Sequence, residues 1–388
     1  MENTNDNRTQ IESDNKSITN KLAIFIVILT VIIAFSVVLL FFVKEKQSAL
    51  EGADSIVRLS AQSGFECEFA EAQKLYPFSE GVLKLTVDRI AYLTISGNEV
   101  YSSTVSYQNP NCFVSGNRAI VADIDGYAFS VIDNEGVVFS KATENKIKAC
   151  FISENGKCAI ITDDDDSYGQ VYVYSEKGDF ICNWISYDSG YPISCVFSDG
   201  DEFLAITSIN TNGADFESFL KVLSITNENG TYKAADYAVY AETTNSILSS
   251  VCYCNPKFYT FSTDSIYMVS DNQMSELAWD YGSFNYVFTV DGYLFMIYSD
   301  GVGQLNKISI MDSSNRIVYD SDLGTQIHAY GYYGNRAAVC VDDRIFVFNT
   351  AGDVLADLSV DEDVLRIGFI SSDKIIIVST GGVHTYNI

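Results

Sequence analysis

Histidine is nearly absent from this chain of 388 residues, which contains only His328 and His384. The chain therefore offers almost no histidine from which a Ser-His-Asp triad or an imidazole metal site could be built. The chain also lacks a Gly-x-Ser-x-Gly elbow, a His-Glu-x-x-His motif and a phosphate-binding loop. His328 begins an apolar strand and is expected to have a structural role. The sequence predicts a protein that is not an enzyme.

Basic residues are also scarce, with 24 Lys and Arg against 51 Asp and Glu and a net charge of −27. Such a chain repels polyanions, and no basic stripe is present, so we expect no nucleic-acid partner. An acidic surface keeps a protein soluble and favours cationic partners.

Charge is missing altogether from the apolar segment between Leu22 and Val43, which Lys21 and Lys44 flank. This segment is long enough to cross a bilayer as a helix, and no good signal-cleavage motif follows it. Basic residues are equally frequent on its two sides, so the orientation rests on the short polar tail before it. We predict a disordered cytoplasmic tail at 1–21, a transmembrane helix at 22–43, a linker at 44–54 and a large extracytoplasmic domain at 55–388. The expected localisation is the cell membrane, with a single pass.

The large domain contains a strand-turn-strand repeat. Seven units place a turn residue seven positions after the start of an apolar strand, and successive turn residues are 37 to 52 positions apart. These turn residues are Gly97, Gly136, Gly178, Gly230, Gln273, Asn315 and Gly352. The interval matches one four-stranded propeller blade. In the seventh unit, alternation predicts strands at 328–332, 336–341, 344–349 and 354–358.

An eighth unit starts its third strand at Val383, but the chain ends at Ile388, before an outer strand. The segment from Ser55 to Ser60 is a candidate for that missing strand, and it would close the ring and remove two free sheet edges. We therefore predict an all-β fold consisting of a single β-propeller with eight four-stranded blades, closed by an N-terminal strand. Seven blades is the alternative if the first unit is irregular.

Nine cysteines in an exported domain suggest disulfides, but the odd number leaves one unpaired. Cys112, Cys150, Cys195 and Cys252 fall at one aligned position on the inner strands of consecutive units, as in Cys-Phe-Val-Ser and Cys-Phe-Ile-Ser. A free cysteine behaves as a small apolar residue, so buried thiols are favoured over disulfides.

Two loops between second and third strands depart from the regular spacing, and such insertions often gather on a binding face. They lie in the third and fourth units, and we expect them side by side. Solvated surface loops are the alternative interpretation. The candidate binding residues are Asp163, Asp164, Asp165, Asp166, Tyr168, Asn210, Asn212, Asp215, Phe216 and Glu217.

No cofactor is expected. The aspartates at 163–166 are a weak candidate for calcium, because Tyr168 stands where a calcium loop needs glycine. The segment Asp123 to Gly126 resembles a fragment of the same loop but lacks the glutamate at the twelfth position. Solvated acidic turns are favoured for both.

Three segments carry a family resemblance: Gly169 to Tyr174, Gly178 to Trp184, and Val196 to Ile206. They resemble an uncharacterised, domain-of-unknown-function family of membrane-anchored quinoprotein-like or WD40-like β-propeller proteins from Gram-positive anaerobic bacteria. The resemblance implies an extracytoplasmic location and unpaired cysteines. It transfers no functional residue, because the shared motifs belong to the fold.

These observations predict a non-enzymatic, membrane-tethered binding or scaffold module for a cell-surface protein or a wall glycan. The alternative is a propeller enzyme, either a quinoprotein-like dehydrogenase or a carboxylate-based hydrolase or lyase. The quinoprotein hypothesis needs a tryptophan repeated in the outer strands, and only Trp184 and Trp279 are present.

Overall fold

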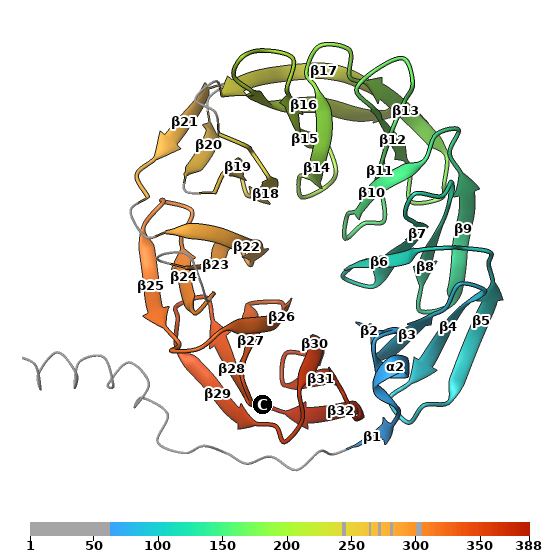
Figure 1. Ribbon diagram of the computed structural model, residues 1–388, viewed down its shortest axis with the longest axis vertical. Coiled ribbons are helices and arrows are strands. Elements are labelled where there is room, and N and C mark those ends of the chain that lie inside the picture. The colour runs from blue at the N-terminus through green and yellow to red at the C-terminus, as the bar shows by residue number, and fades with distance from the viewer. Residues whose placement is uncertain (1–62, 243–245, 264, 271–272, 280–281, 300–304) are drawn as a thin grey trace, which may run out of the picture. The chain divides into compact units, whose positions relative to one another are not determined.

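Eight four-stranded antiparallel sheets surround a central opening in the computed structural model (Figure 1). The structure describes residues 63–242, 246–263, 265–270, 273–279, 282–299 and 305–388. Seven of the sheets are meanders of four consecutive strands, and the eighth combines the two ends of the described chain. The predicted eight-bladed β-propeller is confirmed, and the alternative of seven blades is wrong.

Within each blade the first strand borders the central opening and the fourth lies outside (Figure 1). The first four blades are β2 (Leu75–Phe78), β3 (Gly81–Leu85), β4 (Arg89–Thr94) and β5 (Glu99–Thr104); β6 (Pro110–Ser115), β7 (Arg118–Asp123), β8 (Ala128–Asp133) and β9 (Gly136–Ala142); β10 (Ile147–Ile152), β11 (Cys158–Thr162), β12 (Gln170–Tyr174) and β13 (Phe180–Ile185); and β14 (Tyr191–Phe197), β15 (Phe203–Asn210), β16 (Glu217–Glu228) and β17 (Thr231–Glu242). The next three are β18 (Ser250–Cys254), β19 (Lys257–Phe261), β20 (Ile266–Ser270) and β21 (Gln273–Leu277); β22 (Ser283–Val290), β23 (Tyr293–Ser299), β24 (Lys307–Met311) and β25 (Ile317–Asp322); and β26 (Ile327–Tyr333), β27 (Arg336–Val341), β28 (Arg344–Asn349) and β29 (Val354–Ser359). The eighth is β30 (Val364–Ser371), β31 (Lys374–Ser379), β32 (Gly382–Asn387) and β1 (Ser63–Glu66).

The strand β1 closes the ring by pairing antiparallel with β32, with Ser63 opposite Thr385 and Glu66 opposite Gly382. The prediction of an N-terminal closing strand is confirmed, but its position at 55–60 is wrong. Those residues lie outside the described part of the chain, and the fourth place in the sheet is taken by β1. A close approach at Gly64 explains the choice, because a Cβ atom there would lie 2.1 Å from the Val383 carbonyl oxygen.

Three turn glycines of the repeat, Gly97, Gly178 and Gly352, lie close to side chains of the preceding blade. A Cβ atom at Gly178 would lie 2.7 Å from the Phe139 ring on β9, and Gly178 has a φ of +86°. At Gly97 the corresponding ring belongs to Phe65 on β1, 3.0 Å from the position of a Cβ atom. Glycine satisfies both the positive φ and the close contact. Phe65 on β1 thus makes the contact that Phe139 makes on β9.

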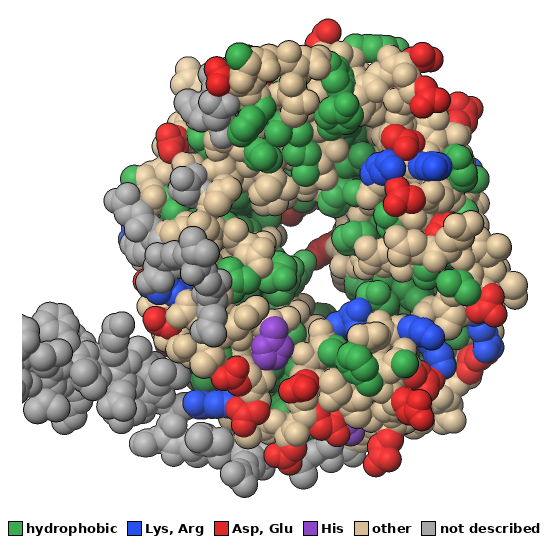
Figure 2. Space-filling model, viewed as in Figure 1, with side chains coloured by type: hydrophobic (Ala, Val, Ile, Leu, Met, Phe, Trp, Pro, Cys, Tyr) green, Lys and Arg blue, Asp and Glu red, His purple; other side chains and the backbone are tan. Residues whose placement is uncertain are grey.

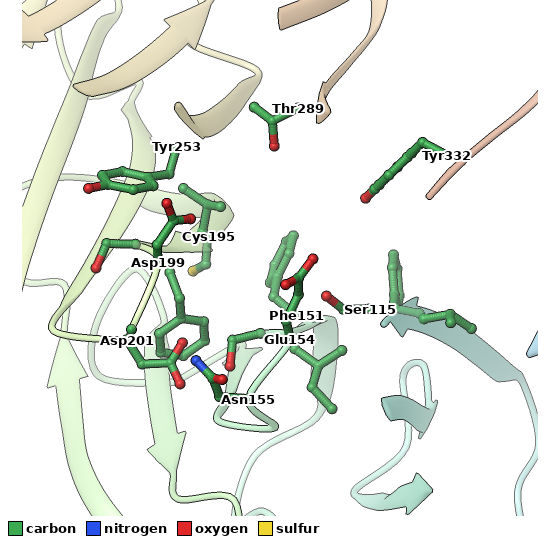
Figure 3. A pocket seen from close by; sticks show the side chains of 18 residues that line it. Ser115, Phe151, Glu154, Asn155, Cys195, Asp199, Asp201, Tyr253, Thr289 and Tyr332 are labelled. Atoms are coloured by element: carbon green, nitrogen blue, oxygen red, sulfur yellow. The ribbon is translucent and has the colours of Figure 1, made fainter. Parts of the chain in front are cut away.

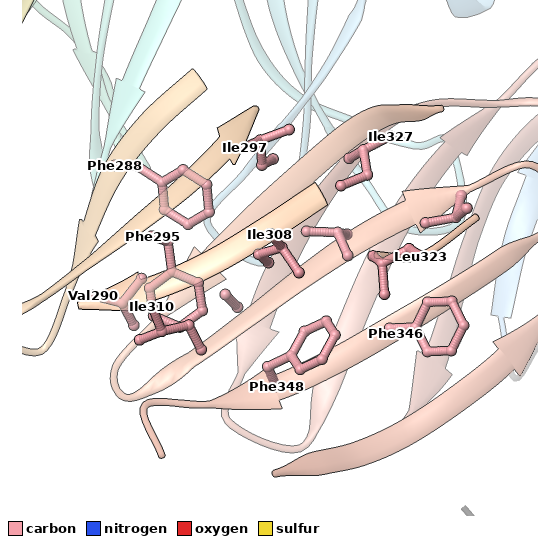
Figure 4. Packing of buried hydrophobic residues seen from close by; sticks show 13 residues of the cluster. Phe288, Val290, Phe295, Ile297, Ile308, Ile310, Leu323, Ile327, Phe346 and Phe348 are labelled. Atoms are coloured by element: carbon pink, nitrogen blue, oxygen red, sulfur yellow. The ribbon is translucent and has the colours of Figure 1, made fainter. Parts of the chain in front are cut away.

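The hydrophobic core is divided into clusters that lie between neighbouring blades. In one of them Phe295 and Ile308 of the sixth blade pack with Phe346 and Phe348 of the seventh (Figure 4). The second strands are buried on both faces, and all five residues of β11 are buried. This double burial explains why these strands are continuous apolar runs rather than alternating ones.

A short helix, α2 (Phe69–Ala72), follows β1 and was not expected from the sequence. With four residues it has no helical period to detect, and Ala72 anchors it in the core between the eighth and first blades. Within the described residues no helix has the length and apolar character needed to cross a membrane. The predicted span at 22–43, the tail before it and the linker at 44–54 lie outside those residues.

Candidate binding site

A pocket of about 450 Å³ opens at one mouth of the central channel. Its walls are the ends of the inner strands β6, β10 and β14 and the loops that follow β10 and β14. Three further blades contribute Tyr253, Thr289 and Tyr332 from β18, β22 and β26 (Figure 3). Side chains from six blades therefore meet around one cavity. Figure 2 shows the opening at the centre of the ring, seen from one face, with hydrophobic side chains around it.

Aromatic rings form the apolar part of the pocket wall. Phe113 of β6 and Phe151 of β10 lie with their ring centroids 6.1 Å apart. Tyr332 stacks on Phe288 at 5.2 Å, yet 46% of its surface is exposed. Phe288 thus supports one face of the Tyr332 ring, and the exposed surface of Tyr332 faces the pocket. This arrangement suits recognition of a flat or extended ligand.

The polar part of the pocket comes from two short loops. The β10–β11 loop supplies Glu154 and Asn155, and the β14–β15 loop supplies Asp199 and Asp201. Glu154 and Asp199 are exposed, whereas Asp201 is only 2% exposed. Figure 3 shows the Asp201 carboxylate turned towards Asn155 at the base of the pocket. Carboxylates from neighbouring blades therefore converge on the same space.

Serine side chains and turn geometry fix these two loops. The Phe203 N–H donates to Ser198 Oγ at 3.0 Å, and the Asp201 N–H donates to the Ser198 carbonyl at 2.9 Å. Asp201 has a φ of +59°, which aspartate tolerates better than most residues. In the β10–β11 loop the Lys157 N–H donates to Ser153 Oγ at 3.1 Å. Ser153 and Ser198 thus occupy equivalent positions in the two blades and hold the two loops in the same way.

Lys157 joins the third and fourth blades below the pocket. Its Nζ atom lies 3.4 Å from Asp201 Oδ2 and 5.5 Å from the centroid of the Tyr232 ring. Asp201 Oδ1 is buried and has no hydrogen-bond partner among the described residues. Three carboxylates line the pocket and one ammonium lies beside Asp201, so the pocket carries an excess of negative charge.

All nine cysteines are unpaired, including the four at the aligned positions where the sequence favours thiols over disulfides. Burial raises the pKa of the Cys195 thiol in the pocket well above its ordinary value, so this thiol is protonated and a poor nucleophile. Cys112, Cys150 and Cys195 pack in the clusters that face the preceding blade. Cys252 instead faces the following blade, where its Sγ donates to the Val287 carbonyl at 3.6 Å. The predicted alignment of Cys252 with the other three is therefore wrong by one residue.

The predicted candidate residues of the third blade lie at the other end of β11 from the pocket. Asp163 Oδ1 accepts from the Lys146 N–H at 2.9 Å, and its Oδ2 pairs with Lys148 at 3.2 Å. Asp164 accepts from Ser167 Oγ at 2.6 Å, and this hydrogen bond lowers the pKa of the Asp164 carboxyl. Asp165 and Asp166 are exposed, and Tyr168 packs edge-on against Tyr191 at 5.1 Å.

The candidate residues of the fourth blade lie at the same end. Much of the insertion at 210–218 extends strands, because Asn210 pairs with Glu217 in the ladder between β15 and β16. Asn210 Nδ2 donates to the Asp188 carbonyl at 3.1 Å. The loop residues from Asn212 to Asp215 are exposed, while Phe216 is half-buried. Tyr168 contacts Tyr191, and Tyr191 pairs with Ile209 just before the insertion, so the two loop regions lie side by side.

The acidic motifs considered for calcium have other contacts. Asp123 Oδ1 accepts from the Gln108 and Asn109 N–H groups at 2.8 and 2.7 Å, and Asp125 pairs with Lys148 at 2.7 Å. Across the described ranges no group of three or more His, Cys, Asp or Glu side chains is placed to hold a metal ion.

The fold and the pocket define an eight-bladed β-propeller with an acidic, aromatic cavity at one mouth of its channel. The chain belongs to DUF5711, a family of unknown function whose model matches residues 57–388. No functionally curated protein matches it.

Two solved structures share the fold. BamB from Moraxella catarrhalis has 10% identity and a TM-score of 0.53, over 85% of this chain and 100% of that one. Saccharomyces cerevisiae Sqt1 has 11% identity and a TM-score of 0.55, over 86% and 100%. At such identities the likeness concerns the fold alone.

One signal in the sequence could have located the pocket. The motif Cys-Phe-Val-Ser of β6 recurs as Cys-Phe-Ile-Ser in β10 and Cys-Val-Phe-Ser in β14. The three residues after each cysteine line the cavity. The same alignment that predicts a buried thiol therefore also marks the channel mouth.

Proposed function

We propose that this chain is a membrane-tethered, extracytoplasmic binding module of an anaerobic Gram-positive bacterium that acts without catalysis and without a cofactor. Its partner is a cell-surface protein or a wall glycan, which it engages through the mouth of its channel. The observation that carries the proposal is the convergence of side chains from six blades on one open pocket.

The composition of the pocket supports binding. Exposed aromatic faces such as those of Phe113 and Tyr332 provide rigid contact area with little loss of side-chain entropy. Glu154 and Asp199 provide charges at the rim that can orient a partner.

Affinity capture with the full chain tests the proposal. The wild type, a Glu154→Gln/Asp199→Asn double variant and an Asp165→Asn control are used as bait in membranes of the native host, after reversible cross-linking. We expect one partner to be recovered by the wild type and the control, and to be depleted with the double variant. Equal recovery by all three baits, or no partner with any, would contradict the proposal.

The tether is tested separately by fractionation. A chain anchored through residues 22–43 stays in the membrane pellet after alkaline extraction, and externally added protease digests its propeller in intact protoplasts. Release of the full chain by alkali, or protection of the propeller, would contradict the proposed anchor or its orientation.

A carboxylate-based hydrolase or lyase is the second candidate function, because Glu154, Asp199 and Asp201 share one cavity. Incubation of the wild type with isolated wall glycan distinguishes the two. New reducing ends or unsaturated products that the double variant does not form would establish an enzyme.

A further inference from the structure

We infer that the pocket receives a cationic group, an ammonium or guanidinium, carried on an apolar stem. The inference rests on the proposed function and adds the chemistry of the ligand. The features that support it are the charge of the pocket, the aromatic walls and one buried carboxylate oxygen without a hydrogen bond.

The charge of the pocket favours a cation. Glu154 and Asp199 are exposed at the rim and Asp201 lies at the base, whereas Lys157 is the cation that lies against this base. Lys157 is already engaged by Asp201 and by the face of Tyr232. A ligand cation would meet carboxylates whose charge is not balanced, and an anion would be repelled.

Asp201 provides the second, independent observation. Its side chain is almost fully buried, and only one of its two oxygens has a partner in the described part of the chain, the Lys157 ammonium at 3.4 Å. A buried acceptor without a hydrogen bond is costly. Oδ1 is enclosed by protein atoms, so a ligand would act on this carboxylate through its charge. Ammonium and guanidinium groups supply that charge, and they carry donors without an acceptor for the exposed Glu154 and Asp199.

The walls fit the stem of such a ligand. Phe113, Phe151 and Tyr332 line the same cavity as the carboxylates. Figure 3 shows Phe151 and Tyr332 among the residues of its wall. Aliphatic stems of Lys and Arg pack well on apolar surface, and their charged ends interact favourably with ring faces. Aromatic walls and carboxylates in one cavity therefore match a cation at the tip of an apolar chain.

Calorimetric titration of the full chain in detergent tests this inference with defined probes. These are n-butylammonium, a peptide with one central Lys, and the same peptide with that Lys acetylated. We expect the unmodified peptide to bind at least tenfold more tightly than the acetylated one, because acetylation removes the charge. Binding of n-butylammonium as tight as that of the peptide would identify a free amine as the source. Clearly tighter binding of the peptide would identify a protein side chain.

Variants locate the binding. The Glu154→Gln/Asp199→Asn double variant should weaken binding of the Lys peptide by about tenfold, since each rim charge contributes a modest amount. The matched control Asp165→Asn removes an exposed carboxylate from the other end of the third blade and should leave the affinity unchanged. Circular dichroism verifies that each variant is folded.

Two results would overturn the inference: equal affinity for the charged and acetylated peptides, or an unchanged affinity in the double variant. If capture recovers a partner that depends on the channel mouth but these probes do not bind, the inference fails and the proposed function stands. If the probes bind but capture recovers nothing, the proposed function fails and the cation site stands.

Discussion

The two ends of the third and fourth blades carry acidic side chains in opposite circumstances. At one end the loops are irregular in sequence, but Asp163, Asp164 and Asn210 are occupied by local partners. At the other end the loops are short and regular, yet the exposed Glu154 and Asp199 share a cavity with Asp201, whose Oδ2 pairs with Lys157. The comparison teaches that an unusual loop length marks where a chain varies, whereas a binding site requires side chains that are not already satisfied by their neighbours.

Two lysines of the third blade give the largest expected difference between the ends. Lys157→Met leaves the Asp201 carboxylate buried without its counter-charge, which should reduce the free energy of unfolding by about 3 kcal/mol. Lys148→Met removes exposed pairs with Asp125 and Asp163 and should cost less than about 1 kcal/mol. Urea unfolding of both variants measures the difference. Equal losses would show that the pair below the pocket has no special role.

Two serines give a smaller difference. Ser198→Ala removes the acceptor of the Phe203 N–H in the β14–β15 loop, and we expect a loss of about 1 kcal/mol. Ser167→Ala acts in the exposed β11–β12 loop and should change the stability less. The same urea assay compares them, and a larger effect of Ser167→Ala would reverse the proposed contrast.

The smallest effect concerns acid titration at the end away from the pocket. The hydrogen bond from Ser167 lowers the pKa of Asp164, so its contribution to stability is present above an unfolded pKa of about 3.9 and is lost as the pH falls through the folded pKa. Ser167→Ala should move the Asp164 pKa towards the ordinary value. Carboxyl chemical shifts followed by NMR measure it, and an unchanged titration would contradict the assigned cause.

Most of the fold could be predicted because its repeat is local. The strands β27 and β28 begin and end where the alternation places them, since turn residues bound each apolar run. The closing strand was predicted at the wrong position, 55–60 instead of Ser63–Glu66, because a four-residue strand has little pattern of its own. Its place is decided by contacts distant in sequence, the approach of Gly64 to Val383 and the packing of Phe65 on Gly97.

The pocket was harder to predict because its parts come from different blades. Aligned cysteines indicate which strands are inner strands, but they do not show that Glu154 and Asp199 face a common space. The misalignment of Cys252 has a similar origin. Its neighbours Val251 and Cys254 belong to clusters on opposite sides of the blade, and consecutive apolar residues do not specify which of them faces which side.

Site-specific photo-cross-linking tests the central claim most directly. Benzoylphenylalanine is placed in the full chain at Tyr332 in the pocket or at Tyr168 at the other end, two partly exposed tyrosines, and membranes are irradiated in the native host. A discrete adduct from position 332 that is lost in the Glu154→Gln/Asp199→Asn background, with none from position 168, is the predicted result. An adduct from position 168 and none from position 332 would contradict the account.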